Sequence, residues 1–155
     1  LTVRELLDPG RIETDLEATS KKSLLDQIAA LIHADRPALD TRDVFQTLLR
    51  REQLGSTAIG HGVALPHGRM AGLERAVGTF VRLRDPADFD AVDGQPVQLV
   101  LALLVPDEEN QHDLQVLARL ARMLDDAVFR QRQLEAPGGE LDELLSGRDE
   151  ELAGS

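Results

Sequence analysis

The chain has 155 residues, of which 42% are apolar and 3% aromatic, and these values predict one globular domain with an aliphatic core. It contains no cysteine, which excludes disulfides and cysteine-ligated metals. Because 28 acidic residues outnumber 17 basic ones, giving a formal charge of -11, we expect no nucleic acid partner. No apolar run approaches the roughly 20 residues that span a bilayer, and no basic-then-apolar leader opens the sequence. We therefore expect a cytoplasmic protein with no membrane partner.

Hydrophobic spacing predicts an edge strand and two helices in the first third of the chain. The strand covers residues 12–16. Ser20 can cap a helix that Pro37 ends, and the apolar residues of this helix recur on one face: Leu24, Leu25, Ile28, Leu31 and Ile32. Asp40 or Thr41 can cap a second helix, whose apolar face is made by Val44, Phe45, Leu48 and Leu49.

Three strands are expected between this helix and the next. Residues 58–65 are apolar but interrupted by two glycines, and residues 75–83 are rich in valine, phenylalanine and leucine. Residues 97–105 are almost continuously apolar, which is typical of a strand that is buried on both faces. Asp93 and Gly94 predict a turn before this last strand.

A third long helix is expected over residues 111–125, with an apolar stripe made by Leu114, Leu117, Leu120, Ala121 and Leu124. Short helices are expected at residues 128–134 and 140–145. Helices, then strands, then helices predict an α/β (α+β) fold, in which helices flank a mixed central β-sheet on both faces. We expect a single domain over residues 1–147, followed by an acidic C-terminal tail at residues 148–155.

The segment from residue 51 to residue 69 concentrates the unusual residues of the chain. It holds four glycines, two hydroxyl residues, two histidines and two arginines. Glycine weakens a strand unless the backbone needs a special dihedral angle or a close approach. A bulged strand entering a turn would explain any single glycine here, but the whole cluster favours a functional site.

His67 is the main functional candidate in this segment. Pro66 before it stiffens the backbone, and Gly68 after it removes side-chain bulk. A neutral imidazole, with a pKa of about 6.5, is a good nucleophile near neutral pH. Arg51 or Arg69 could bind a phosphoryl group on His67, and two hydroxyl groups, those of Ser56 and Thr57, could donate further hydrogen bonds. On the Pro-His-Gly tripeptide alone, a half-exposed turn histidine with a salt-bridging arginine is the preferred interpretation.

Three sharper alternatives fail on spacing or on missing residues. His61 and His67 would lie roughly 20 Å apart along a straight strand, so no metal is expected. The glycines at 55, 60 and 62 lack the lysine and the hydroxyl residue of a phosphate-binding loop, and Leu65 stands where a dinucleotide fingerprint needs glycine. A Gly-x-Ser-x-Gly hydrolase motif is absent from the sequence.

A family resemblance is carried by residues 54–69, whose sequence is Leu-Gly-Ser-Thr-Ala-Ile-Gly-His-Gly-Val-Ala-Leu-Pro-His-Gly-Arg. This segment resembles the active-site signature of the enzyme IIA proteins of the fructose/mannitol class in the bacterial phosphotransferase system. Residues 89–97, with the apolar run after them, are similar to the segment that leads into that family's central strand. Residues 19–23 and the helix after them resemble the nitrogen-regulatory branch. The likeness covers roughly residues 1–145.

The resemblance implies roles for several residues. His67 corresponds to the histidine that accepts a phosphoryl group from a phosphohistidine carrier protein (HPr-like), and Arg51 to the arginine that stabilises the phosphate. The family often has a second histidine directly before a leucine of the third helix, where this chain has Asp113, and His112 lies one position earlier. Either His112 supports the phosphoryl site, or it is a surface residue and Asp113 has a different role. No cofactor is implied.

We therefore expect a phosphocarrier with a regulatory role, which binds regulatory target proteins according to its phosphorylation state, rather than a turnover enzyme acting on a small molecule. Two alternatives stay open. One is a sugar-specific enzyme IIA that passes the phosphoryl group to a separate IIB protein. The other is an interaction module that is never phosphorylated.

Overall fold

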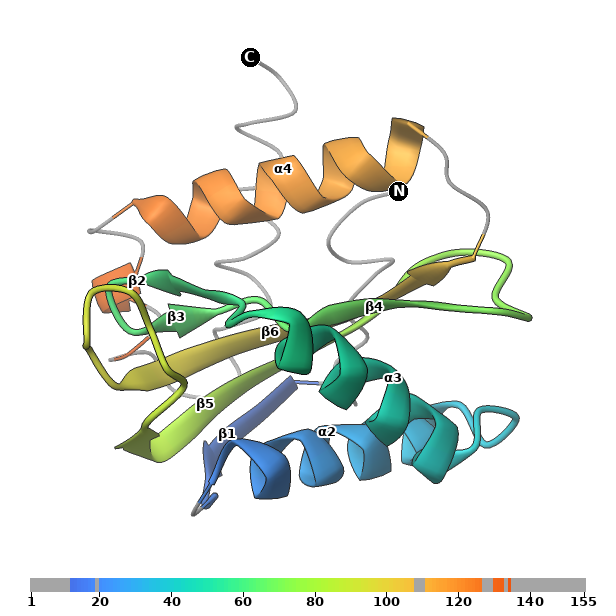
Figure 1. The fold of residues 1–155 in the computed structure, drawn as a ribbon, viewed down its shortest axis with the longest axis horizontal. Helices are drawn as coiled ribbons and strands as arrows, with labels where there is room; N and C mark the ends of the chain where they lie inside the picture. The colour runs from blue at the N-terminus through green and yellow to red at the C-terminus, as the bar shows by residue number, and fades with distance from the viewer. Residues whose placement is uncertain (1–11, 19, 108–110, 127–129, 133, 135–155) are drawn as a thin grey trace.

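The computed structural model describes residues 12–18, 20–107, 111–126, 130–132 and 134 (Figure 1). Its centre is a six-stranded mixed sheet with the order β1-β5-β6-β3-β2, and β4 pairs with the far end of β6. The strands are β1 (Ile12–Leu16), β2 (Ala58–Gly60), β3 (Val63–Ala64), β4 (His67–Met70), β5 (Val77–Ala87) and β6 (Val97–Pro106). β6 is antiparallel to β5 and parallel to both β3 and β4, so it organises the whole sheet.

Two capped helices, α2 (Lys21–Asp35) and α3 (Thr41–Leu54), follow the first strand. The Ser20 hydroxyl accepts a hydrogen bond from the backbone N–H of Ser23, at 3.1 Å. The Asp40 carboxylate accepts two, from the N–H groups of Arg42 and Asp43, at 2.9 and 3.1 Å. These bonds satisfy backbone donors that have no partner inside the helix, which confirms both predicted caps.

The helices lie on both faces of the sheet, as Figure 1 shows. The buried apolar residues of α2 and α3 pack with Val77, Val81 and Val100 on one face. On the other face, α4 (Gln111–Asp125) packs Leu120, Met123 and Leu124 against a layer that includes Phe80 and Leu101. The predicted mixed sheet between two helical layers is confirmed, and β6 is buried on both faces as expected.

The segment between α3 and β5 differs from the sequence prediction. Residues 58–65 form two short antiparallel strands rather than one, because the chain reverses at His61 and Gly62. The prediction also missed β4, whose residues show no alternation of apolar and polar side chains. α3 extends to Leu54, past Leu49, the last residue of its predicted apolar face.

The remaining expectations concern the last part of the chain. Within residues 128–134, the described residues 130–132 and 134 are helical. The predicted helix at residues 140–145 and the acidic tail at 148–155 lie outside the described residues. Among the residues that are described, no helix is long and apolar enough to cross a membrane.

One polar group in the core offers a test of the packing. Thr79 on β5 is fully buried, and its hydroxyl has no hydrogen-bond partner among the described residues. Thr79→Val keeps the shape and removes the desolvated hydroxyl, so it should raise the free energy of unfolding by about 1 kcal/mol in urea denaturation. Thr79→Ser keeps the hydroxyl but loses the methyl group, and it should lower stability. A destabilised Thr79→Val variant would show that the hydroxyl has a partner.

Candidate functional site

The candidate site forms where β4 packs against α3. A Cβ atom added to Gly68 would lie 2.7 Å from Thr47 Cγ2 and 3.2 Å from the Thr47 carbonyl oxygen. The first distance is too short for any real side chain, so only glycine allows this approach. The glycine therefore brings His67, its neighbour on β4, close to the C-terminal half of α3.

His67 is the first residue of β4 and is half-buried. It pairs with Leu103 of β6, whose backbone N–H donates to the Pro66 carbonyl oxygen at 2.9 Å. The ring atom Nδ1 lies 2.8 Å from the Leu65 carbonyl oxygen. Because a carbonyl oxygen can only accept, this contact requires the proton on Nδ1. Nε2 then carries the lone pair of the neutral ring.

A surface cavity of about 720 Å³ lies beside the imidazole. Its lining includes His67, the exposed side chain of Leu54 and three arginines, namely Arg50, Arg51 and Arg69. In a chain with a formal charge of -11, three arginines that line one cavity with a histidine make a local site suited to an anion. Guanidinium groups match the oxygens of a phosphoryl group in both charge and geometry.

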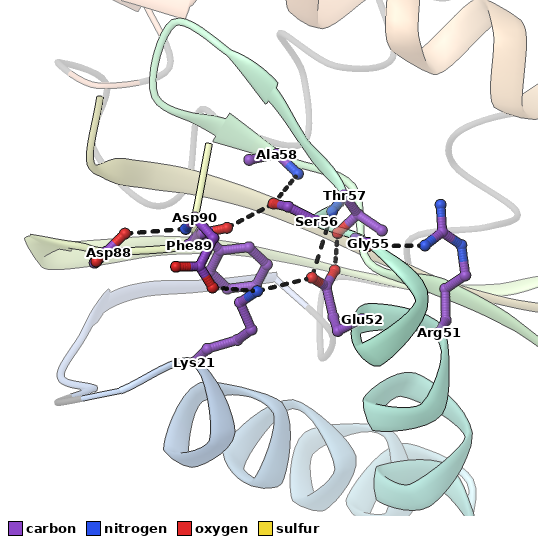
Figure 2. Close-up of polar contacts among 10 residues, drawn as sticks. All are labelled: Lys21, Arg51, Glu52, Gly55, Ser56, Thr57, Ala58, Asp88, Phe89 and Asp90. Atoms are coloured by element: carbon purple, nitrogen blue, oxygen red, sulfur yellow. Dashed lines mark hydrogen bonds and ion pairs between the residues drawn. The ribbon is translucent and has the colours of Figure 1, made fainter. Parts of the chain in front are cut away.

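Arg51 lies in the last turn of α3, and its Nη1 donates to the Gly55 carbonyl oxygen at 2.9 Å (Figure 2). The structure thus brings three predicted residues, His67, Arg51 and Arg69, to one cavity. Arg50 joins them and was missed, because the family signature pointed only to Arg51 on this helix. The basic pair at the end of an amphipathic helix was the signal that could have revealed it.

Ser56 and Thr57 are engaged elsewhere and do not line this cavity. The Ser56 hydroxyl donates to the Phe89 carbonyl oxygen at 2.5 Å and accepts from the N–H of Ala58 at 3.1 Å. The Thr57 hydroxyl donates to the buried Glu52 carboxylate. Figure 2 shows both hydroxyl groups pointing into this network, on the side of the loop away from Arg51.

His61 occupies a different place from the one that a straight strand implied. It forms the turn between β2 and β3 with a φ of 58°, and its N–H donates to the Asp93 carboxylate at 2.9 Å. It lines a second cavity of about 640 Å³, which His67 does not share. Across the described part of the chain, no group of three histidine or carboxylate residues could hold a metal ion.

The predicted accessory residues, His112 and Asp113, fall in the first turn of α4. Their side chains are not among those that the structure describes, so the choice between them stays a prediction.

Comparison with known proteins agrees with this geometry. The family model described as phosphoenolpyruvate-dependent sugar phosphotransferase system, EIIA 2, matches residues 5–140. The chain belongs to this EIIA family. Its predicted family is thereby confirmed, and so is the class of function, a phosphocarrier of the phosphotransferase system that exchanges phosphoryl groups with other proteins of that system.

Individual EIIA relatives point to one branch of the family. A nitrogen regulatory protein of Pseudomonas aeruginosa is 40% identical over 90% of this chain and 91% of its own length. Another, from Bradyrhizobium diazoefficiens, is 44% identical over 81% of this chain and 82% of its own. The crystal structure of nitrogen regulatory protein IIA-Ntr from Neisseria meningitidis superposes with a TM-score of 0.87, at 40% identity, covering 92% of this chain and 98% of that one.

The contact between Gly68 and Thr47 predicts how the EIIA site responds to one added methyl group. Gly68→Ala must push β4 away from α3, which should lower the free energy of unfolding by about 1–3 kcal/mol and move His67 away from Arg50 and Arg51. Adding Thr47→Ser removes the nearer clashing atom and should restore part of the stability. Chemical denaturation checks both variants, and a Gly68→Ala protein as stable as the parent would contradict the close approach.

The turn that carries His61 predicts a dependence of stability on pH. Hydrogen bonds from the backbone N–H groups of His61 and Gln95 hold the pKa of Asp93 below its ordinary value of 3.8. A carboxylate with a lowered pKa in the folded state stabilises the protein above its unfolded pKa, and this contribution is lost as pH falls through the folded pKa. Asp93→Asn should therefore flatten the acid limb of a plot of stability against pH. If the stability of Asp93→Asn fell with decreasing pH as steeply as that of the parent, the Asp93 carboxylate would make no pH-dependent contribution to stability.

Proposed function

We propose that His67 accepts a phosphoryl group through Nε2 from the phosphohistidine of an HPr-like carrier protein, and that the phosphorylation state governs binding to regulatory target proteins. The observation that carries the proposal is the hydrogen bond from Nδ1 to the Leu65 carbonyl oxygen. It fixes the ring as a nucleophile whose lone pair is on Nε2. The Arg51 side chain, at the same cavity, is suited to holding the phosphoryl oxygens.

The transfer balances without a cofactor. The Nε2 lone pair attacks phosphorus, and the phosphorus–nitrogen bond of the donor breaks, so the donor imidazole leaves with the electron pair. The His67 ring, now substituted at Nε2 and protonated at Nδ1, carries a positive charge. The Leu65 carbonyl oxygen continues to accept the Nδ1 proton and so stabilises that charge. The phosphoryl oxygens gain their countercharge from Arg51, with Arg50 and Arg69 at the cavity rim.

The regulatory part of the proposal rests on the relatives that are named nitrogen regulatory proteins. A phosphoryl group brings about 1.5 to 2 negative charges, and the positive charge of the substituted ring offsets one of them. At His67 the phosphoryl oxygens would lie at the cavity that three arginines line, so the same surface would present a different electrostatic pattern to a partner. This chain shares its fold with a chain in a solved complex of enzyme IIA mannitol and phosphorylated enzyme IIB mannitol from Escherichia coli. The TM-score is 0.72 and the identity 23%, and the match covers 89% of this chain and 95% of that one.

The test is phosphorylation of the purified chain by phosphoenolpyruvate, enzyme I and an HPr-like carrier. We expect one added phosphoryl group by mass spectrometry, none in His67→Gln, and transfer slowed at least tenfold in Arg51→Ala. His33→Gln is the matched control, because the Nδ1 atom of His33 also bonds a backbone carbonyl oxygen, that of Leu39, at 2.6 Å. His112→Ala and Asp113→Ala, compared in the same assay, decide which residue supports the site.

Label on another residue, or full labelling of His67→Gln, would sink the site assignment. An unlabelled wild-type chain would favour the interaction module that is never phosphorylated. Onward transfer to a sugar-specific IIB protein would overturn the regulatory role in favour of sugar transport.

A further inference from the structure

Glu52 is an unusual residue to find in the interior of this protein. Its side chain is only 1% exposed, although it lies one position from Arg51, which lines the cavity. Burying a carboxylate is unfavourable unless its oxygens are paired and hydrogen-bonded. Leucine or methionine at this position would fill the space without that penalty, so the carboxylate calls for a specific explanation.

Both oxygens of Glu52 bind the loop that follows α3. Oε1 accepts a hydrogen bond from the Thr57 hydroxyl, and Oε2 accepts the backbone N–H of Thr57, at 3.3 Å. Thr57 itself is 4% exposed. The buried Glu52 carboxylate therefore accepts hydrogen bonds from both the backbone N–H and the hydroxyl of Thr57. These two bonds fix the position and the orientation of the loop.

Lys21 supplies the countercharge from the first turn of α2. Its Nζ lies 3.1 Å from Glu52 Oε2 and 3.2 Å from Asp90 Oδ2, and it stands 4.8 Å from the centre of the Phe89 ring. Burial lowers the pKa of Lys21, but the hydrogen bonds to the two carboxylates outweigh it and raise the pKa above its ordinary value. The lysine thus stays charged and ties α2 and the segment after β5 to Glu52.

The loop held in this way includes the carbonyl that orients Arg51. Gly55 lies two residues before Thr57, and its carbonyl oxygen accepts the hydrogen bond from Arg51 Nη1 at 2.9 Å. Between them, the Ser56 hydroxyl anchors the loop to the Phe89 carbonyl oxygen. Figure 2 shows the whole path from Lys21 through Glu52 and Thr57 to Gly55 and Arg51.

We infer that Glu52 is a positioning residue for phosphoryl transfer: through Thr57 and Gly55 it holds the guanidinium of Arg51 in the orientation that receives the phosphoryl oxygens. The inference rests on the proposed function of His67. The sequence predicted that the Thr57 hydroxyl donates a hydrogen bond directly to the phosphoryl group. In this inference Thr57 acts indirectly, as the link between Glu52 and the loop. Because the guanidinium is already oriented before the reaction, the transition state does not bear the free-energy cost of orienting it.

The decisive experiment is a double-mutant cycle between Thr57→Val and Arg51→Ala. Thr57→Val keeps the backbone hydrogen bond and the shape but loses the hydroxyl donor to Glu52. We measure the single-turnover rate of transfer from the phosphorylated HPr-like carrier at saturation, and the free energy of unfolding of each protein. Thr57→Val should slow transfer about tenfold in the parent and leave the residual rate of Arg51→Ala unchanged, because its effect passes through Arg51.

Two controls separate positioning from stability. Thr57→Ser keeps the hydroxyl and should restore most of the rate. Thr79→Ser removes a buried methyl group from β5, away from the loop and from Lys21, so it should lower stability and leave the saturating rate unaltered. If Thr57→Val folds poorly, Glu52→Gln is the second variant, because its amide retains one acceptor oxygen where the carboxylate has two.

A readout that needs no phosphorylation is the ¹⁵N NMR signal of the Arg51 guanidinium. The signal should indicate restricted rotation of the Arg51 guanidinium in the parent and free rotation in Thr57→Val. Equal slowing in the parent and the Arg51→Ala background, or an unchanged guanidinium signal, would overturn the positioning role. If the wild-type chain accepts no phosphoryl group, the proposed function fails, and the NMR signal still decides whether Glu52 orients Arg51.

Discussion

The close packing of Gly68 against Thr47 is the constraint on which the candidate site depends. It places a strand of four residues directly against α3 at Thr47, with no room for a side chain at position 68. β6 fixes the other edge of that strand through pairing from Leu103 to Pro106. His67 and Arg69 are therefore located by the sheet, while Arg50 and Arg51 are located by the helix. The site exists because the two elements meet, and neither element contains it alone.

A single hydrogen bond then defines the tautomer of the located imidazole, which is the proposed nucleophile. The Leu65 carbonyl oxygen can only accept, so Nδ1 carries the proton and the lone pair is on Nε2, the atom proposed to take the phosphoryl group. On the helix side, the guanidinium of Arg51 is held by the Gly55 carbonyl, and the loop of Gly55 is held by the buried Glu52. The two side chains that we propose to act on the phosphoryl group are thus each held by a backbone carbonyl oxygen before any donor arrives.

The sequence was sufficient for the features that depend on local patterns. The caps at Ser20 and Asp40, and the doubly buried strand β6, follow from side-chain chemistry and hydrophobic period, and the structure has all three. The family signature led directly to His67 and Arg51, which line one cavity. In these cases the residue type itself specifies the local structure.

The features that the sequence could not supply depend on distant parts of the chain. β4 exists because β6 pairs with it, and its own residues carry no strand pattern. The turn at His61 needs a positive φ, which glycines on both sides allow but do not require. Glu52 lies four residues after Leu48, on the apolar face of α3, but the spacing does not reveal the group that pairs with the buried carboxylate. That partner, Lys21, comes from another helix.

The central claim is that Nε2 of His67 carries the phosphoryl group while Nδ1 keeps its proton for the Leu65 carbonyl. The most direct measurement is two-dimensional NMR of the chain labelled with ¹⁵N in its histidines, recorded before and after phosphorylation. The account predicts a phosphorus–nitrogen coupling at Nε2 and a proton retained on Nδ1. Coupling at Nδ1, or at either nitrogen of another histidine, would contradict it.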